Sequence, residues 1–121
     1  MTTQQVADRY YELAKQKRWP ELVAELYSQH IVNREPEHAI AIGIPTVTVG
    51  MEAVNAKSAA RREMIQEIHD QFCSAPIVAG NFFTLSMGRD ITYKGKPRIK
   101  VEEIAVFEVK DGKIVLEQFF Y

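Results

Sequence analysis

Two glutamates in this sequence occupy positions where the alternation of a β-strand would place a carboxylate among apolar side chains. Alternate residues of a strand share one face, so Glu35 lies on the same face as Ile31 and Asn33. Glu103 shares its face with an apolar set, namely Val101, Ala105, Phe107 and Val109. A carboxylate on a buried face needs a partner or a raised pKa, and both properties occur in general acid–base catalysts. The alternatives are a solvated strand-end carboxylate for Glu35 and an ion pair with a neighbouring Lys or Arg for Glu103.

Tyr10 and His69 complete the set of candidate catalytic residues. Tyr10 lies in the apolar stripe of a predicted helix, where its phenol is either a hydrogen-bond donor in a site or a core group with a satisfied hydroxyl. His69 can act as an acid or base in a pocket if the segment around it is a strand that turns the ring inward. The alternative is a histidine with no catalytic role, which is also what we expect of His30 and His38 at the surface.

Metal, nucleotide and cysteine chemistry find no support in the sequence. The three histidines and the single cysteine show no short ligand spacing, and no glycine-rich phosphate-binding pattern is present. Cys73 is best interpreted as a small apolar core residue. We therefore expect any chemistry to need no metal and no cofactor.

Composition indicates one soluble domain, residues 1–121, with 46% hydrophobic residues. Lys and Arg number 15 against 16 Asp and Glu, a balance that does not favour nucleic acid as a partner. No apolar run is long enough to span a membrane, and residues 1–12 lack the pattern of a secretory signal. These features predict a cytoplasmic protein.

The helices that must position these side chains are predicted in the first half of the chain. Thr2 and Gln5 form a capping-box pattern before an apolar stripe at helical spacing, which consists of Val6, Ala7, Tyr10, Tyr11, Leu13 and Ala14. Pro20 starts a second, shorter helix. A third helix is expected from about Met51 to Met64, with Arg61, Arg62 and Glu63 in solvent.

Strands are predicted mainly in the second half. Ile40, Ile42 and Ile44 alternate with small residues, which indicates a strand or a structured loop, and residues 67–73 could extend the third helix or form a strand. Strand-forming residues then fill 77–93, 99–109 and 113–121, with a hairpin turn at Asp111-Gly112. This order predicts an α+β fold, in which three N-terminal helices pack on a strongly curved antiparallel or mixed sheet and leave an internal apolar pocket for a small ligand.

The whole chain resembles the SnoaL-like family of the nuclear transport factor 2-like superfamily. The residues that carry the resemblance are Trp19, Leu22, Leu26-Tyr27, Glu35-Pro36, Gly50–Ala53, Asn81–Phe83, Val101–Ile114 and Glu117–Tyr121. It implies a cone-shaped α+β barrel, a strand at residues 67–73 and a homodimer packed through the sheet. Because this fold hosts isomerases, cyclases, dehydratases and binding modules, it does not identify the function.

The first part of the chain is also similar to the ketosteroid isomerases. The similarity implies that Tyr10 corresponds to their oxyanion-donating tyrosine and Glu35 to their general-base aspartate. The protonated acid of their oxyanion hole falls at Ala105, which cannot donate, and Glu103 is displaced by about 6.6 Å along the strand. By analogy with SnoaL-type cyclases, His69 is the histidine nearest the cavity. The site therefore departs from that of a steroid isomerase.

Two hypotheses follow for the function. The first is a small-molecule pocket protein that performs cofactor-independent proton transfer, as an isomerase, cyclase or dehydratase, on a compact apolar carbonyl compound through Glu35, Tyr10, Glu103 and His69. The second is a non-catalytic dimeric module for ligand sensing or interaction, for which the aromatic strand end at Phe119–Tyr121 would form part of an interface.

Overall fold

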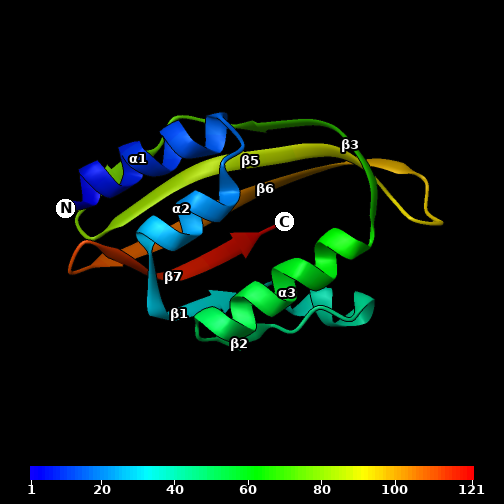
Figure 1. Cartoon of the computed structure of the whole chain (residues 1–121), viewed down its shortest axis with the longest axis horizontal. Helices are drawn as coiled ribbons and strands as arrows, with labels where there is room; N and C mark the ends of the chain where they lie inside the picture. The colour runs from blue at the N-terminus through cyan, green and yellow to red at the C-terminus, as the bar shows by residue number, and fades with distance from the viewer.

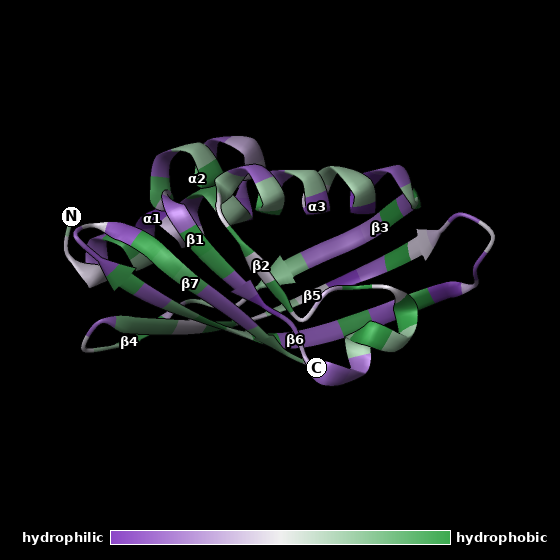
Figure 2. Cartoon of the chain, turned by 90° about the horizontal axis from the view of Figure 1, so that it is seen from below, coloured by the Kyte–Doolittle hydropathy of each residue, from purple (hydrophilic) through white to green (hydrophobic).

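Three α-helices pack on one side of a seven-stranded sheet in the computed structural model of the chain, which describes residues 1–121 (Figures 1 and 2). The helices are α1 (Thr3–Lys15), α2 (Trp19–Leu26) and α3 (Met51–Glu63), with a short 3₁₀ helix, η1 (Glu37–Ile42). The strands are β1 (Tyr27–Arg34), β2 (Val47–Val49), β3 (Ile65–Cys73), β4 (Ile77–Ala79), β5 (Phe82–Tyr93), β6 (Arg98–Lys110) and β7 (Lys113–Phe120). The predicted α+β class is confirmed.

The helices begin where the local sequence favours a start. Thr2 and Gln5 form a reciprocal capping box, because each side chain accepts a hydrogen bond from the backbone N–H of the other residue. Pro20 lies in the first turn of α2. Gly50 precedes α3 with a φ of 92°, and its N–H donates to the carbonyl of Ile31 at 2.7 Å. This hydrogen bond fixes the start of α3 against β1.

The sheet is mixed and open. Its strand order is β2-β1-β7-β6-β5-β3, with β4 paired to β5, and the two ends of this order do not meet. β1 and β7 run parallel, whereas every other pair is antiparallel. Asp111 and Gly112, both at positive φ, form the β6–β7 turn. The chain therefore adopts the expected cone fold without closing its sheet into a complete barrel.

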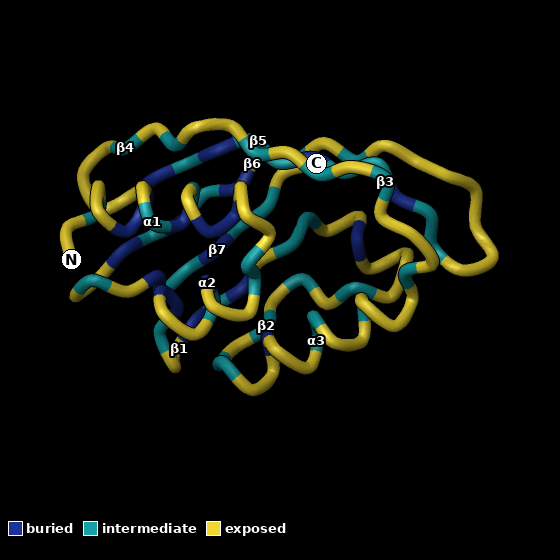
Figure 3. The backbone as a smooth tube through the Cα atoms, turned by 45° about the horizontal axis from the view of Figure 1, so that its top comes forward, coloured by how far each residue is buried: buried dark blue, intermediate teal, exposed yellow.

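The apolar core lies under α1 and α2. Buried positions gather there and along β5, β6 and β7, while α3 is mostly exposed or intermediate (Figure 3). Phe83 and Phe107 stack at a centroid distance of 4.7 Å and an interplanar angle of 17°. Tyr10 lies 4.8 Å from the Phe107 ring and 5.7 Å from the Phe83 ring. Aromatic packing therefore joins α1 to the centre of the sheet.

Two segments that the sequence left open are now assigned. Residues 65–73 form β3, antiparallel to β5, so the alternative of an extended α3 is wrong. The alternating isoleucines around residue 40 belong to η1, a structured loop rather than a strand, which ends at Gly43 in a left-handed conformation. Ile40 and Ile42 are exposed.

None of the helices has both the length and the apolar character needed to span a membrane.

Candidate functional site

Glu35 follows β1 directly and is held in place by backbone and side-chain contacts. Its N–H donates to the carbonyl of Thr46 at 2.9 Å. Its side chain is only 11% exposed, and Ile31 and Asn33 on the same face are buried. The predicted alternation therefore gives the right face, and the alternative of a solvated strand-end carboxylate does not describe this residue.

Both carboxylate oxygens of Glu35 accept hydrogen bonds. Lys57 of α3 donates from Nζ to Oε1 at 2.9 Å and also to Oδ1 of Asn33 at 2.5 Å. The Tyr121 hydroxyl donates to Oε2 at 2.9 Å. Burial and the bond to Glu35 raise the pKa of Tyr121 above its ordinary value, so this phenol stays a donor. Glu35 is thus oriented from α3 on one side and from the end of β7 on the other.

A second buried carboxylate, Glu117 of β7, extends this arrangement into the core. Asn33 donates from Nδ2 to Glu117 Oε1 at 2.8 Å, and the Tyr27 hydroxyl donates to Oε2. Burial raises the pKa of Glu117, and the two hydrogen bonds oppose this rise. Hydrogen bonds therefore run without interruption from Tyr27 through Glu117, Asn33, Lys57 and Glu35 to Tyr121.

Glu103 lies on the inner face of β6, with a side chain that is 8% exposed. Its closest cation is Arg89 of β5, whose guanidinium lies 3.5 Å from the carboxylate. Burial raises the pKa of Glu103, the charge of Arg89 opposes this, and the charge of Glu35 adds to it. The charge of Glu35 thus acts on Glu103. Glu103 has both an ion-pair partner and a raised pKa.

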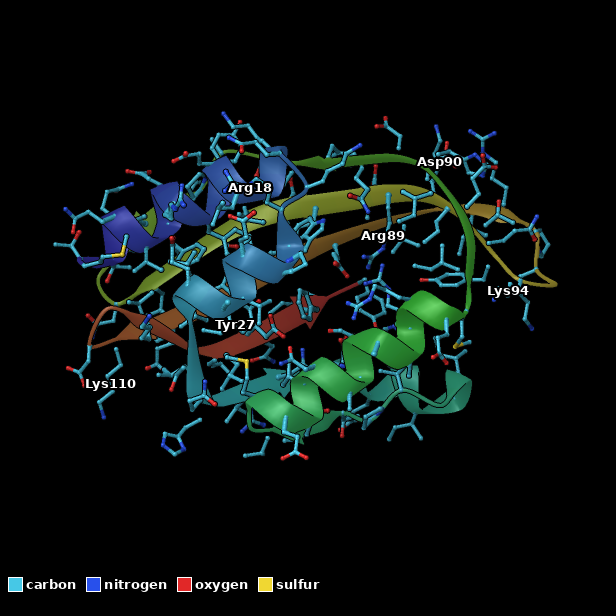
Figure 4. All side chains as sticks on the ribbon, in the orientation of Figure 1. Arg18, Tyr27, Arg89, Asp90, Lys94 and Lys110 are labelled. Carbon is cyan, nitrogen blue, oxygen red and sulfur yellow. The ribbon has the colours of Figure 1, made fainter.

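Two arginines, Arg89 of β5 and Arg61 of α3, carry charges that lower the pKa of Glu103. Arg89 projects from β5 toward the space between β6 and α3, whereas Asp90, the next residue, lies on the other side of β5 (Figure 4). The Nε atoms of both arginines are buried and have no hydrogen-bond partner. Arg62 and Glu63 are exposed, as expected, whereas Arg61, in the last turn of α3, is half-buried with its Nε covered. We call Glu35, Lys57, Arg61, Arg89 and Glu103 the charged cluster.

Tyr10 belongs to the aromatic core rather than to the charged cluster. It is 2% exposed and packs against Phe83, Phe107 and Trp19. Burial raises the pKa of Tyr10, and the charges of Glu117 and Glu103 raise it further. The structure thus places Tyr10 near the inner end of the hydrogen-bond chain, away from Glu35.

His69 lies on the other face of the sheet. It occupies a bulge between Ile68 and Asp70, where β3 has one residue more than β5. A ring nitrogen of His69 contacts the Thr92 hydroxyl at 2.8 Å. Thr92 shares its face with Asp90, opposite to that of Arg89, so the structure does not bring His69 to the charged cluster.

Two surface depressions lie away from all four predicted site residues. One of about 570 Å³ is lined by Gln29, residues 49–53 and Ala56. The other, of about 380 Å³, lies between the N-terminus and the β6–β7 turn. No three His, Cys, Asp or Glu side chains gather so that they could hold a metal ion. Neither depression is lined by a residue of the charged cluster.

Sequence reasoning missed most of the partners of the two glutamates. These are Asn33, Lys57, Arg61, Arg89, Glu117 and Tyr121. Arg89 had a readable signal, because it alternates with Met87 and Ile91 on a buried strand face. Lys57 had none, since a lysine on a polar helix is normally solvated.

Several solved structures share this fold, and one of them is also similar to the chain in sequence. A Mesorhizobium loti protein proposed to be a SnoaL-like polyketide cyclase is 30% identical, with full coverage of both chains and a TM-score of 0.90. A Burkholderia pseudomallei protein of unknown function with the nuclear transport factor 2-like fold is 16% identical, covers 100% of this chain and 91% of its own, and gives 0.80. A Catenulispora acidiphila protein with a ketosteroid isomerase-like fold, solved with trimethylamine, is 20% identical, with coverages of 84% and 74% and a TM-score of 0.67.

The family itself is established from the sequence. No curated protein matches the chain. The SnoaL-like domain, however, matches residues 1–121, the entire chain. Together with the open cone fold described above, this match shows that the protein belongs to the SnoaL-like domain family.

Proposed function

We propose that this protein binds a compact, mostly apolar carbonyl compound beside the charged cluster and transfers a proton on it without a cofactor. The observation that carries the proposal is the buried pair of carboxylates, Glu35 and Glu103, which interact electrostatically and have different partners. When their surroundings give two carboxylates different pKa values, one can act as a base while the other keeps its charge state.

Glu103 is the better base of the two. Both oxygens of Glu35 already accept hydrogen bonds, from Lys57 and Tyr121, which makes them weaker proton acceptors. Glu103 has a single long contact with Arg89 and a raised pKa, which strengthens it as a proton acceptor when ionised. Glu35 then positions Lys57, whose remaining N–H can stabilise charge that develops on the carbonyl oxygen. Tyr10 and His69 take no direct part in the proposed step.

The family supports the reaction class. The Mesorhizobium loti protein, 30% identical over its full length, is itself proposed to be a polyketide cyclase. Isomerases, cyclases and dehydratases of this kind begin by removing a proton next to a carbonyl group. We therefore place isomerisation, cyclisation or dehydration of one such compound in this site.

Deuterium incorporation tests the proposal without knowledge of the natural substrate. A panel of cyclic and aryl ketones is incubated with the protein in D₂O, and loss of the α-proton signal is followed by NMR. We expect accelerated exchange for at least one ketone, reduced on the order of a hundredfold or more in Glu103→Gln. Glu102→Gln is the matched control, because Glu102 is the exposed neighbour on the opposite face of β6.

Unchanged exchange in a folded Glu103→Gln variant would remove Glu103 as the base. If Glu103 is the base, the rate of deuterium exchange should fall less in Glu35→Gln than in Glu103→Gln. The reverse order would assign the base to Glu35, as the ketosteroid isomerase similarity implies.

A non-catalytic dimeric module is the second candidate, and the outer face of the sheet favours it. Phe120, Ile104 and Phe82 are 46–50% exposed and lie on this face. Phe119, by contrast, packs against the core and would not form such an interface. Sedimentation velocity should show a dimer that Phe120→Asp dissociates, while Phe119 substitutions act on folding. A monomeric wild-type protein would contradict the dimer.

A further inference from the structure

Lys57 is held by two acceptors of its own protein. Its Nζ donates to Oε1 of Glu35 at 2.9 Å and to Oδ1 of Asn33 at 2.5 Å, and its side chain is only 23% exposed. A lysine side chain otherwise moves among many rotamers. Because an ammonium carries three N–H donors in a tetrahedral arrangement, two fixed acceptors also fix the direction of the third. The third N–H of Lys57 therefore has a defined direction.

The amide of Asn33 can serve Lys57 in only one of its two orientations. An amide has a donor end and an acceptor end, and half a turn exchanges them. Nδ2 of Asn33 donates to Oε1 of Glu117 at 2.8 Å, so Oδ1 faces the Lys57 ammonium. The reversed amide would set N–H donors against an ammonium and an oxygen against a carboxylate. Glu117 therefore decides which end of Asn33 reaches Lys57.

The surroundings of Glu117 keep it an acceptor. The Tyr27 hydroxyl donates to Oε2 and Asn33 to Oε1, so both oxygens accept hydrogen bonds. Glu117 and Asn33 are register partners on β7 and β1, and both are buried. The charge of Lys57 lowers the pKa of Glu117 and thus opposes the effect of burial. The ionised state of Glu117, the orientation of Asn33 and the charge of Lys57 therefore favour one another.

We propose that Glu117 and Asn33 are positioning residues, which together with Glu35 hold the Lys57 ammonium in one orientation. Glu117 acts on Lys57 through the Asn33 amide. This inference rests on the proposed function, in which the remaining N–H of Lys57 stabilises charge on the carbonyl oxygen. A donor that is oriented before the reaction needs no reorganisation as this charge develops. Glu117 is therefore expected to affect kcat more than KM.

The ¹H–¹⁵N NMR signals of the Lys57 ammonium and the Asn33 side-chain amide report on this arrangement without a substrate. We expect Glu117→Gln to shift both, because the amide that replaces the carboxylate no longer requires the donor end of Asn33. Tyr27→Phe is the matched control, since it removes only the donor to the other oxygen of Glu117. It should shift the Lys57 signal far less. Backbone amide spectra show whether each variant is folded.

A double-mutant cycle tests whether Glu117 acts through Asn33. Asn33→Leu nearly keeps the volume and removes both ends of the amide, so it should shift the Lys57 signal as well. In the Asn33→Leu background, Glu117→Gln should add no further shift. If Glu117→Gln does not fold, Glu117→Asp keeps the charge but shortens the side chain by one methylene, and it should shift the Lys57 signal by weakening the contact with Asn33.

The ketone exchange assay supplies the kinetic readout. Glu117→Gln should lower kcat by about tenfold and leave KM within about twofold. An unchanged Lys57 signal in folded Glu117→Gln, an equal shift in Tyr27→Phe, or a further shift in the double variant would each overturn the inference. If the Lys57 signal responds as expected but the wild type catalyses no exchange, the positioning of Lys57 is supported and the proposed catalysis is contradicted. The two proposals can therefore fail separately.

Discussion

The two halves of the concave face are built from opposite kinds of side chain. Under α1 and α2 the sheet presents stacked aromatic rings, and α1 alone buries five residues. The other half holds the charged cluster, to which α3 itself contributes Lys57 and Arg61, and α3 buries only Val54. One half thus contributes apolar packing, and the other holds buried charges that cost desolvation energy. The side chains that stabilise the fold by packing and the side chains proposed to react therefore lie in different halves of one sheet.

The largest effect should come from the aromatic half. Phe107→Ala removes a fully buried ring that stacks on Phe83 and packs against Tyr10, so it should lower the free energy of unfolding by about 3–5 kcal/mol. Urea denaturation measures this change. Phe120→Ala is the control, because that ring is 50% exposed and should cost far less. Equal losses in the two variants would remove the distinction between the halves.

Lys57→Met should have the next largest effect. It removes the shared donor of Asn33 and Glu35 and leaves a carboxylate that is 11% exposed without its cation. A loss of about 1–3 kcal/mol is expected in the same denaturation assay. Arg62→Met, on the exposed side of α3, should change stability by less than about 0.5 kcal/mol. A more stable Lys57→Met variant would show that the ion pair costs more to bury than it contributes.

The pH dependence of stability should reveal the buried carboxylates. Because the pKa of Glu103 is raised in the folded protein, the folded state binds more protons than the unfolded state above the ordinary value of 4.5. The free energy of unfolding should therefore fall as pH rises through the folded pKa, by at most about 1.4 kcal/mol per pH unit for one group. The pKa of Glu117 is shifted in the same direction.

Glu103→Gln removes one of the two groups, so its stability should decline less steeply with pH than that of the wild type. Glu102→Gln should retain the full slope. The carboxylates of the exposed pairs, such as Asp90 with Arg98, have lowered pKa values and lose their contribution only at more acidic pH. A Glu103→Gln variant whose stability declines with pH as steeply as that of the wild type would contradict the raised pKa of Glu103.

Tyr121→Phe should give the smallest effect. It deletes one hydrogen bond to Glu35 from a ring that is 40% exposed, at a cost of about 0.5–1 kcal/mol. The ¹³C shift of the Glu35 carboxyl should change with it, because one oxygen loses its donor. An unchanged shift would mean that this contact does not persist in solution.

The sequence alone predicted the fold better than the site, for reasons that particular residues show. The capping box and the Asp111-Gly112 turn depend on neighbouring residues, so short-range chemistry was enough to predict them. The alternation from Ile31 to Glu35 gave the correct buried face for the same reason. The face on which His69 lies could not be predicted in this way, because His69 is an unpaired bulge residue and breaks the alternation of β3.

The partners of Glu35 and Glu103 come from elements far away in the chain. Lys57 is 22 residues from Glu35, and Tyr121 is 86 residues away. Arg61 and Arg62 are neighbours of the same type, and only the packing of α3 distinguishes the inward residue from the exposed one. Such contacts follow from tertiary packing, which no local pattern encodes.

The parallel pairing of β1 with β7 has a consequence for the order of folding. Tyr27 is paired with Ile114, and Arg34 with Gln118, so this pairing closes loops of more than eighty residues. During synthesis, β1 has no parallel partner until residues 113–120 have left the ribosome. Antiparallel neighbours such as β5 and β6 can pair much earlier, because their loop closure costs less entropy. The hydrogen bonds that link Glu117 to Glu35 through Asn33 and Lys57 therefore cannot form before β7 has been synthesised.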